Sequence, residues 1–399
     1  YFSVGAQAVT PFKFIVPGRF VYGTEFRLED IAQPRTLFST DKGTGKVTEK
    51  ELAGAIPRSR YDVTSAFLLA ELRPSNRVTF SGGLRFETTG FKSSPDAIDA
   101  IAPFTTKDIT VDKRWNSVVW SVGPVFALTD ELSIAANVGT GFRVPTPFEL
   151  VLTQVQGNVT GVSTIPSTTL EPVKSMTVEG GPRWVSKHFK SSFTGYYTKL
   201  DKLIGFVNTP ITIDIPGVGV VPTRRNENSL DGFIVGFESY VEAQLPSLPE
   251  LTVFGNLTYT FGWDEQRDVP LRGIPPINGI AGVRWESRPR RWWTEAVVHL
   301  AARKTAVAPE EKTDQAFATD PGLGSPNATT NPPLDPKFEI PGYAVLNLRG
   351  GVTVWRSGER NINVMGAINN VFNTSYRPAF ASIKEAPGVG ADLAVKAAF

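Results

Sequence analysis

The chain has 399 residues, with 41 Lys and Arg against 39 Asp and Glu, so its formal net charge is only +2. A charge this close to zero gives no reason to expect nucleic acid as a partner. No run of about 18 apolar residues is present that would cross a bilayer as a helix. Cys is absent, which excludes disulfides and thiolate metal sites, and the 36 Gly and 31 Pro fit many strands separated by turns.

Apolar and polar residues alternate in steps of two along much of the chain. In 77–88, for example, Val78 and Leu84 alternate with Arg85 and Glu87. Successive side chains of a strand point to opposite faces, so this period predicts strands. The predicted strands span 2–10, 17–29, 60–72, 77–89, 114–128, 132–142, 173–186, 189–207, 223–244, 250–263, 277–287, 291–303, 342–355, 361–374 and 388–399.

The connections between these strands alternate strictly between short and long. The short ones carry turn residues and the long ones are rich in Pro, Asn, Asp and Thr. Short periplasmic turns and long outer loops are typical of outer-membrane β-barrels, whereas a soluble sandwich has no reason to sort its loops by length. The short turns lie at 73–76, 129–131, 186–188, 246–249, 288–290 and 357–360, and the long loops at 30–59, 90–113, 143–172, 208–222, 264–276, 304–341 and 375–387.

Strand length favours the membrane over a soluble sandwich. Strands of a sandwich are typically about five or six residues long, but most of these run to roughly 10–16, which suits a tilted crossing of a bilayer. The sequence therefore predicts an all-β fold, a transmembrane antiparallel β-barrel of outer-membrane type. We expect one row of side chains to face lipid (Val78, Leu84, Leu257, Leu348) and the other to face a wet lumen (Arg85, Asn256, Glu238, Arg349).

Tryptophans cluster near the short turns, where an aromatic girdle marks a membrane interface. Those expected in the girdle are Trp184, Trp285, Trp292, Trp293 and Trp355. The chain also ends on an alternating strand with Phe399 in last position, which resembles the signal read by barrel-assembly machinery.

Several segments resemble the C-terminal β-barrel of TonB-dependent outer-membrane receptors. They follow the order of that family over 139–399, whereas residues 1–138 fit by pattern only. The segments are Gly141-Phe142-Arg143-Val144-Pro145-Thr146-Pro147-Phe148-Glu149-Leu150, Leu170-Glu171-Pro172-Val173-Lys174-Ser175, Tyr196-Tyr197-Thr198-Lys199-Leu200-Asp201-Lys202-Leu203-Ile204, Gly236-Phe237-Glu238, Pro270-Leu271-Arg272-Gly273-Ile274-Pro275-Pro276 and Asn369-Asn370-Val371-Phe372-Asn373-Thr374-Ser375-Tyr376-Arg377.

The resemblance implies a larger protein, because members of that family have 22 strands around a lumen filled by a plug. About fifteen strands are visible here, and an odd number does not close an all-antiparallel barrel. We therefore expect 1–399 to be the C-terminal portion of the barrel, beginning near the eighth strand, with the plug and early strands missing. A plugless descendant that closes with fewer strands is the alternative, and pairing of 17–29 with 388–399 would show it.

No catalytic constellation is visible, so we do not expect an enzyme, a cofactor or a metal site. His188 lies in a short turn and His299 in a strand, and 143–172 holds no His, which leaves haem as a minor option for a receptor of this family. Acidic residues of the loop 304–341 have the oxygen ligands that calcium prefers, but solvated loop acids are the simpler reading. Those residues are Glu310, Glu311, Asp314, Asp320 and Asp335.

The resemblance implies a receptor of the bacterial outer membrane that takes up a scarce ligand, for which a ferric siderophore is our expectation. Its partners would be outer-membrane lipid and lipopolysaccharide, a plug domain or a chain that supplies the missing strands, and the TonB complex through a missing N-terminal segment. Candidate ligand-binding residues on the lumen wall are Arg85, Glu87, Arg183, Glu238 and Arg349. Two alternatives remain: a partner-sealed barrel serving as a structural subunit of an envelope complex, and a soluble β-rich enzyme.

Overall fold

A computed structural model describes the chain except for residues 14, 34, 53, 55, 100–103, 152–162, 216–218, 288–290, 310, 312–338, 379–385 and 399. The expectations for Glu310, Asp314, Asp320, Asp335 and Phe399 and for the turn at 288–290 therefore lie outside the described residues.

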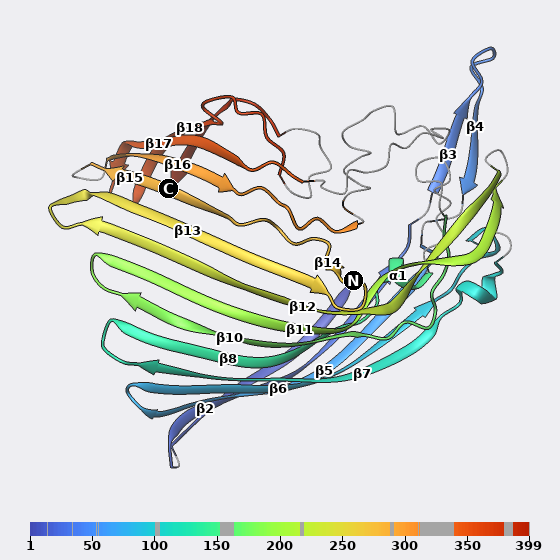
Figure 1. The fold of residues 1–399 in the computed structure, drawn as a ribbon, viewed down its shortest axis with the longest axis horizontal. Coiled ribbons are helices and arrows are strands. Elements are labelled where there is room, and N and C mark those ends of the chain that lie inside the picture. Colours follow the sequence, from blue (N-terminus) through green and yellow to red (C-terminus); the bar gives the residue numbers. More distant parts are fainter. Residues whose placement is uncertain are drawn as a thin grey trace.

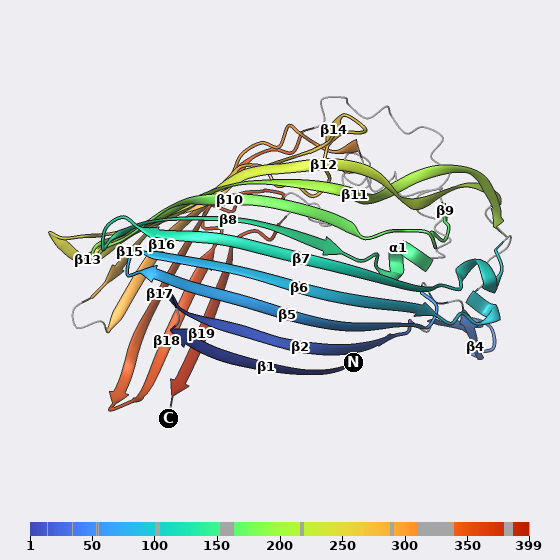
Figure 2. The ribbon, with the colours of Figure 1, turned by 90° about the horizontal axis from the view of Figure 1, so that it is seen from below.

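In the described residues, fifteen long strands form one antiparallel wall, and each predicted strand overlaps one of them. Figures 1 and 2 show that this wall is strongly curved, as period-two strands with the ordinary twist would make it. The strands are β1 (Phe2–Lys13), β2 (Pro17–Ile31), β5 (Ser59–Ser75), β6 (Val78–Ser93), β7 (Asp112–Ala127), β8 (Leu132–Arg143), β10 (Val173–Val185), β11 (Phe189–Ile215), β12 (Gly219–Leu245), β13 (Leu248–Asp264), β15 (Asn278–Glu286), β16 (Trp292–Ala301), β17 (Tyr343–Ser357), β18 (Arg360–Asn369) and β19 (Gly390–Ala398).

Short turns gather at one end of the wall and long connections at the other (Figure 1), as the alternation of loop lengths predicts. The long connections carry the helix α1 (Pro147–Val151), two 3-10 helices (Ala97–Asp99 and Thr106–Ile109) and the short strands β9 (Ser163–Thr164) and β14 (Val269–Pro270). Within the described ranges, no helix has the length and apolar character needed to span a membrane.

Two of the long connections contain strands that the sequence pattern does not reveal. The connection 30–59 holds a hairpin of β3 (Arg35–Thr40) and β4 (Val47–Leu52). The connection 208–222 is not a loop as predicted, because β11 and β12 continue through it and each reaches 27 residues. Pro210 and Pro222 suggest a loop there, but a register shift between Thr209 and Thr212 absorbs Pro210.

The register divides the wall into two faces. Residues directly opposite each other in antiparallel strands share a face, so a face can be followed from strand to strand. Arg85 pairs with Val119, Asn137 with Glu179, and Glu295 with Arg349. Traced in this way, the five candidate lumen residues fall on one face, together with Asn256. Val78, Leu84, Leu257 and Leu348 fall on the opposite face.

The outer connections show which face is the interior. Around α1 they pack on Tyr61, Phe91 and Trp115, which share the face of Arg85. Far along the wall, the backbone N–H of Asn370 donates to Asn347, which shares the face of Arg349. The polar face is therefore the lumen wall, because the connections fold over it at both places.

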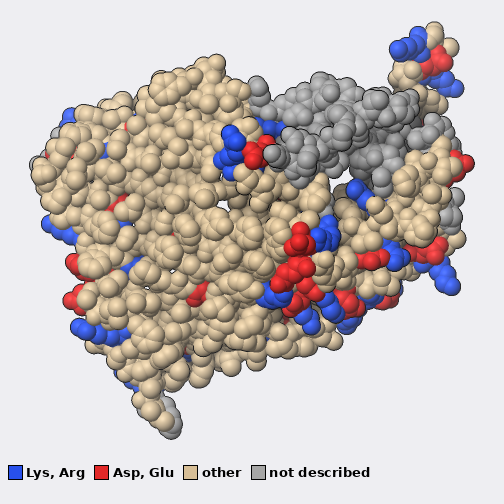
Figure 3. Space-filling model, in the orientation of Figure 1, with Lys and Arg blue, Asp and Glu red and all other residues tan. Residues whose placement is uncertain are grey.

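The opposite face exposes apolar side chains, as a lipid-facing surface would. Leu84 is 53% exposed, Val118 59% and Leu257 43%. In the view of Figure 3, charged side chains lie mainly toward the two ends of the strands, with a wide band between them that carries few charges. Four of the five predicted girdle tryptophans lie on this outer face, but Trp293 does not. It faces the lumen, where the guanidinium of Arg284 lies 4.7 Å from its ring centroid.

The edges of the wall exclude the small closed barrel. One edge of β2 pairs with β1 and the other with β5, so 17–29 is not free to pair with β19. β19 itself pairs with β18. Among the described residues, no hydrogen-bonded pairing joins β1 to β19, so the wall is open between these two strands.

Candidate functional site

The helix α1 begins the connection that follows β8, and its sequence explains its start. Thr146 caps the helix and Pro147 follows at the first helical position, where a missing N–H is tolerated. The Glu149 carboxylate accepts a hydrogen bond from the Thr146 backbone N–H at 2.7 Å, and the Thr146 hydroxyl accepts one from the Glu149 N–H at 3.3 Å. This reciprocal pair is a capping box, which fixes α1 at the rim of the lumen.

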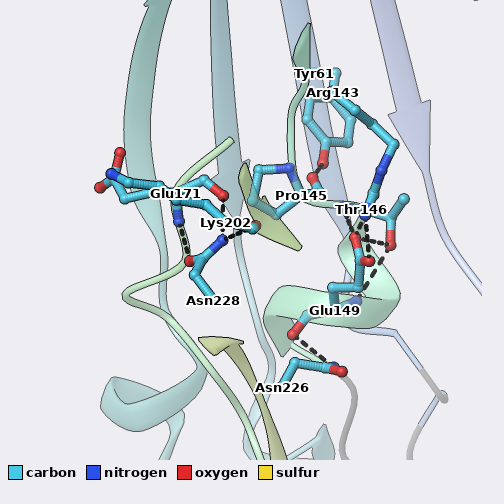
Figure 4. A network of polar contacts seen from close by, with 9 residues as sticks. All are labelled: Tyr61, Arg143, Pro145, Thr146, Glu149, Glu171, Lys202, Asn226 and Asn228. Carbon is cyan, nitrogen blue, oxygen red and sulfur yellow. Dashed lines mark hydrogen bonds and ion pairs between the residues drawn. The ribbon is translucent and has the colours of Figure 1, made fainter. Parts of the chain in front are cut away.

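Glu149 also joins α1 to the wall. Two nitrogens of Arg143, at the end of β8, donate to its two carboxylate oxygens at 2.7 and 2.9 Å. Burial would raise the pKa of Glu149, but the hydrogen bonds from Arg143 and Thr146 outweigh it and hold that pKa below its usual range. The Tyr61 hydroxyl donates to the carbonyl of Pro145, which ties β5 to the same connection (Figure 4).

An apolar cluster lies beneath these polar contacts. It is built from wall residues and from the connections, and it contains Ile56, Phe91, Val111, Trp115, Leu150, Val151 and Leu170. Leu150 and Val151 are fully buried. The helix thus packs its apolar side on the inner wall.

Two asparagines of β12 bind the same region from the other side. The Asn226 amide donates to the Glu149 carbonyl at 3.1 Å. Asn228 exchanges hydrogen bonds of 2.8 and 2.9 Å with the backbone of Glu171 and donates to the Lys202 carbonyl at 2.8 Å (Figure 4). Lys202 has a φ of 56°, in a register shift of β11. Three segments that resemble the receptor family therefore meet in space at this rim of the lumen. They are 141–150, 170–175 and 196–204.

Replacing Glu149 by Gln is expected to loosen α1, because it removes the carboxylate that both Arg143 and Thr146 bind. A hydrogen bond to a charged group contributes about 1.5–3 kcal/mol. Since the folded pKa lies below the usual value, the contribution is present at neutral pH and is lost as the pH falls through the folded pKa. The protection of the 148–151 amides, measured as exchange relative to the intrinsic rate at each pH, should therefore fall on acidification in the wild type and vary little with pH in E149Q. Equal acid responses would contradict this role.

The charges of the lumen wall are organised as ion pairs along neighbouring strands. Arg85 lies 3.1 Å from Glu87 and 3.3 Å from Glu25 of β2. Arg349 lies 3.9 Å from Glu295 of β16. The pairing of Arg85 with Glu87 follows from their spacing on one strand face, whereas Glu25 and Glu295 come from other strands and are missed by reading one strand at a time.

The five candidate ligand-binding residues do not converge on one point. Arg85 and Glu87 lie together on β6, but Arg183 lies near the short turn after β10, Glu238 on β12 and Arg349 on β17. They are distributed around the lumen wall, so the structure does not bring them together in a single site.

The remaining candidates have identifiable surroundings. Glu311 is buried, so the expectation of a solvated acid is wrong for this residue. Its carboxylate accepts from the Lys304 ammonium at 2.7 Å and from the backbone N–H of Gly273 at 2.8 Å. Nδ1 of His188 lies 3.3 Å from the side-chain oxygen of Gln244, and His299 faces the lumen. In the described part of the chain, no group of three or more His, Asp or Glu is arranged so that it could hold a metal ion.

Comparison with solved structures supports the fold. The copper transporter OprC superposes with a TM-score of 0.72 at 16% identity, over 98% of this chain and 56% of OprC. The siderophore receptor PirA from Acinetobacter baumannii gives a TM-score of 0.66 at 16% identity, over 98% of this chain and 54% of PirA. At these identities the likeness concerns the fold alone.

Comparison with sequences supports the family. The rhizobactin receptor of Rhizobium meliloti (strain 1021) is 21% identical over 348 residues, which is 82% of this chain and 40% of that receptor. The chain thus spans well under two thirds of the relatives it matches. The family described as "TonB dependent receptor-like, beta-barrel" matches residues 1–371. Because this match covers most of the chain, the protein belongs to the TonB-dependent receptor family, in the region that forms the outer-membrane β-barrel.

Proposed function

We propose that this chain forms part of the barrel wall of an uptake receptor for a scarce metal chelate, a ferric siderophore. The observation that carries the proposal is the continuous polar face, lined with ion pairs and closed over at one end by outer connections that pack on it. Such a face suits a lumen through which a hydrophilic ligand passes, and the opposite apolar face suits lipid. The rhizobactin receptor and PirA support a siderophore as ligand, while OprC supports copper as the rival cargo.

The remaining parts of the mechanism belong to the proposal as well. The barrel would hold a plug in the lumen, supplied by protein outside these residues together with the other strands. The TonB complex would act on a segment outside these residues, and release of the plug would pass the ligand inward. Outer-membrane lipid and lipopolysaccharide would surround the apolar face.

The uptake test uses a bacterial strain that lacks its own ferric-siderophore receptors and carries the full-length gene. Radioactive iron supplied as a panel of ferric siderophores is expected to accumulate in these cells, and the accumulation is expected to vanish when TonB is deleted. Accumulation of radioactive copper is measured in the same strains. Copper accumulation without iron accumulation would contradict the siderophore assignment. Correct assembly with accumulation of neither metal would favour a structural subunit of the envelope.

The orientation is testable because the chain has no cysteine of its own. Thr44 lies at the tip of the β3–β4 hairpin, at the end of the wall that carries the long connections, and Ser247 lies in the short turn between β12 and β13. A Cys at Thr44 is expected to react with a membrane-impermeant thiol reagent on intact cells. A Cys at Ser247 is expected to react only after the outer membrane is permeabilised. The reverse pattern would overturn the topology.

A further inference from the structure

Three cations lie close together on the outer, apolar face of the wall, where β5, β6 and β7 reach the long connections (Figure 1). They are Arg60 near the start of β5, Lys92 near the end of β6 and Arg114 near the start of β7. Their side chains are 57%, 65% and 54% exposed. Arg60 lies opposite Lys92, and Arg114 lies opposite Gly90, two residues from Lys92. All three cations therefore share the face of Leu84, which points away from the lumen.

The register brings two like charges directly opposite each other. Arg60 and Lys92 form one pair of the β5–β6 ladder, and like charges in such a pair destabilise a sheet. Each cation has a carboxylate on its other side, Asp30 at 2.7 Å from Arg60 and Asp112 at 3.7 Å from Lys92. The cations thus occupy the centre of this row and the carboxylates its two flanks. An anion at the centre would reduce the repulsion between the two cations.

The third cation lies across the neighbouring strand. Arg114 of β7 lies 2.9 Å from Asp62 of β5, with Gly90 of β6 between them in the ladder. A Cβ at position 90 would lie 2.4 Å from the Asp62 carboxylate and 2.7 Å from the Arg114 guanidinium. Because glycine has no side chain, the guanidinium can lie over β6, one step along the strand from Lys92.

The chemistry of this face changes in order along the strands. Residues two apart on a strand share a face and lie about 7 Å apart, so the ladders divide the face into rows. The rows are Arg60–Lys92–Asp112, Asp62–Gly90–Arg114, Thr64–Thr88–Asn116, Ala66–Phe86–Val118 and Leu68–Leu84–Trp120. We call these five rows the boundary surface. It passes from charged groups, through uncharged hydroxyl and amide groups, to apolar groups of which Phe86 is 47% and Val118 59% exposed.

We propose that the boundary surface binds a phosphorylated glycolipid of the outer leaflet. A phosphate between Lys92 and Arg60 relieves their repulsion and accepts charge-assisted hydrogen bonds, to which Arg114 contributes from the next row. The sugar hydroxyls then lie beside the row of Thr64, Thr88 and Asn116, and the acyl chains lie on the apolar rows. The inference uses the proposed topology, because it places this end of the strands outside, and it is independent of the ligand that the receptor transports.

The experiment measures binding of bis-phosphorylated lipid A to the purified, delipidated full-length receptor in detergent. K92Q and R114Q are each expected to weaken binding about ten-fold, the loss that one charge-assisted hydrogen bond would cause. D62N is expected to strengthen binding, because it releases Arg114 from its ion pair and keeps the cation. R19Q is the matched control, since Arg19 is 53% exposed and lies 2.7 Å from Glu71, but on the lumen face near a short turn. Its binding is expected to equal that of the wild type. Unheated gels check that each variant is folded.

Binding of lipid A by K92Q and R114Q with wild-type affinity would overturn the inference. Equal weakening in R19Q would do the same, and so would wild-type binding of dephosphorylated lipid A as tight as that of lipid A. Inorganic phosphate and phosphatidylglycerol are measured alongside, and equally tight binding of either would overturn the assignment to a glycolipid. Import of ferric complexes is measured separately. A receptor that shows the expected lipid A pattern and imports no metal would contradict the proposed function and leave this inference in place.

Discussion

Replacing Lys304 by Met is expected to destabilise the base of the longest outer connection by about 3–5 kcal/mol, the usual cost of breaking a buried ion pair from one side. The side chains of Lys304 and Glu311 are 3% and 5% exposed and lie 2.7 Å apart. Glu311 also accepts from the N–H groups of Gly273 and Ala308, so it joins two connections. Lys304 in turn forms a β-bridge with Ile340, which brings the two stems of the connection together. Without the ammonium, the carboxylate is left buried and uncompensated.

Hydrogen exchange provides the measurement, because the loss is expected to be local. The amides of Gly273, Ala308 and Ile340 should exchange faster in K304M, while the barrel strands keep their protection. The matched control is R303M, since Arg303 is 67% exposed and its pair with Glu339 at 3.0 Å is a surface one, for which about 0–1 kcal/mol is usual. Adding E311Q to K304M should restore part of the protection by removing the buried charge. Equal exchange in K304M and R303M would show that the buried Lys304–Glu311 pair does not hold the two stems of the connection together.

Replacing Leu257 by Arg is expected to lower the yield of folded barrel strongly. Leu257 lies in the middle of β13 on the outer, apolar face and is 43% exposed there. A cation placed on the lipid face at mid-bilayer costs about 2–4 kcal/mol, because no water reaches it. The measurement is the folded fraction on unheated gels after refolding of the full-length protein into lipid vesicles.

The control for L257R is its neighbour on the same strand. Thr258 faces the lumen opposite Glu238 of β12, so T258R places its guanidinium in water and beside a carboxylate. T258R is therefore expected to fold with a yield near that of the wild type. A larger loss in T258R than in L257R would show that the two faces have been assigned the wrong way round, and similar losses would show that both positions lie in apolar surroundings.

The strands could be predicted from the sequence because the alternation that identifies each strand lies within its own residues. Each side chain alternates with its neighbour between lipid and lumen, so stretches such as 77–88 and 251–261 show the pattern without knowledge of their partners. Fifteen predicted strands, the sorting of loops by length and the resemblance of the six motifs all follow from such local signals. The placement of Arg85 and Arg349 on the lumen face follows from the same parity.

The structure at the end of the wall that carries the long connections could not be predicted in this way. Its residues are positioned by partners far along the chain. Pro210 and Pro222 suggest a loop, yet both lie in strands that form a long hairpin with a register shift. Asp41 caps the turn of the β3–β4 hairpin by accepting from Gly43 and Thr44 at 2.8 Å, in a connection whose short strands show too few alternations to be recognised. Trp293 sits near a short turn like the girdle residues, but its parity and Arg284 place it in the lumen.

The sequence by itself thus determined the antiparallel strands of an outer-membrane type of barrel, the polar and apolar faces of most of them and the family that the chain resembles. Only the tertiary structure decided which distant groups meet: Glu149 with Arg143 and Asn226, Arg85 with Glu25, and Lys304 with Glu311. The physical reason is the range of the constraint. Lipid on one side and water on the other act on every residue of a strand, whereas a hydrogen bond or ion pair acts on two residues that the sequence separates by any distance.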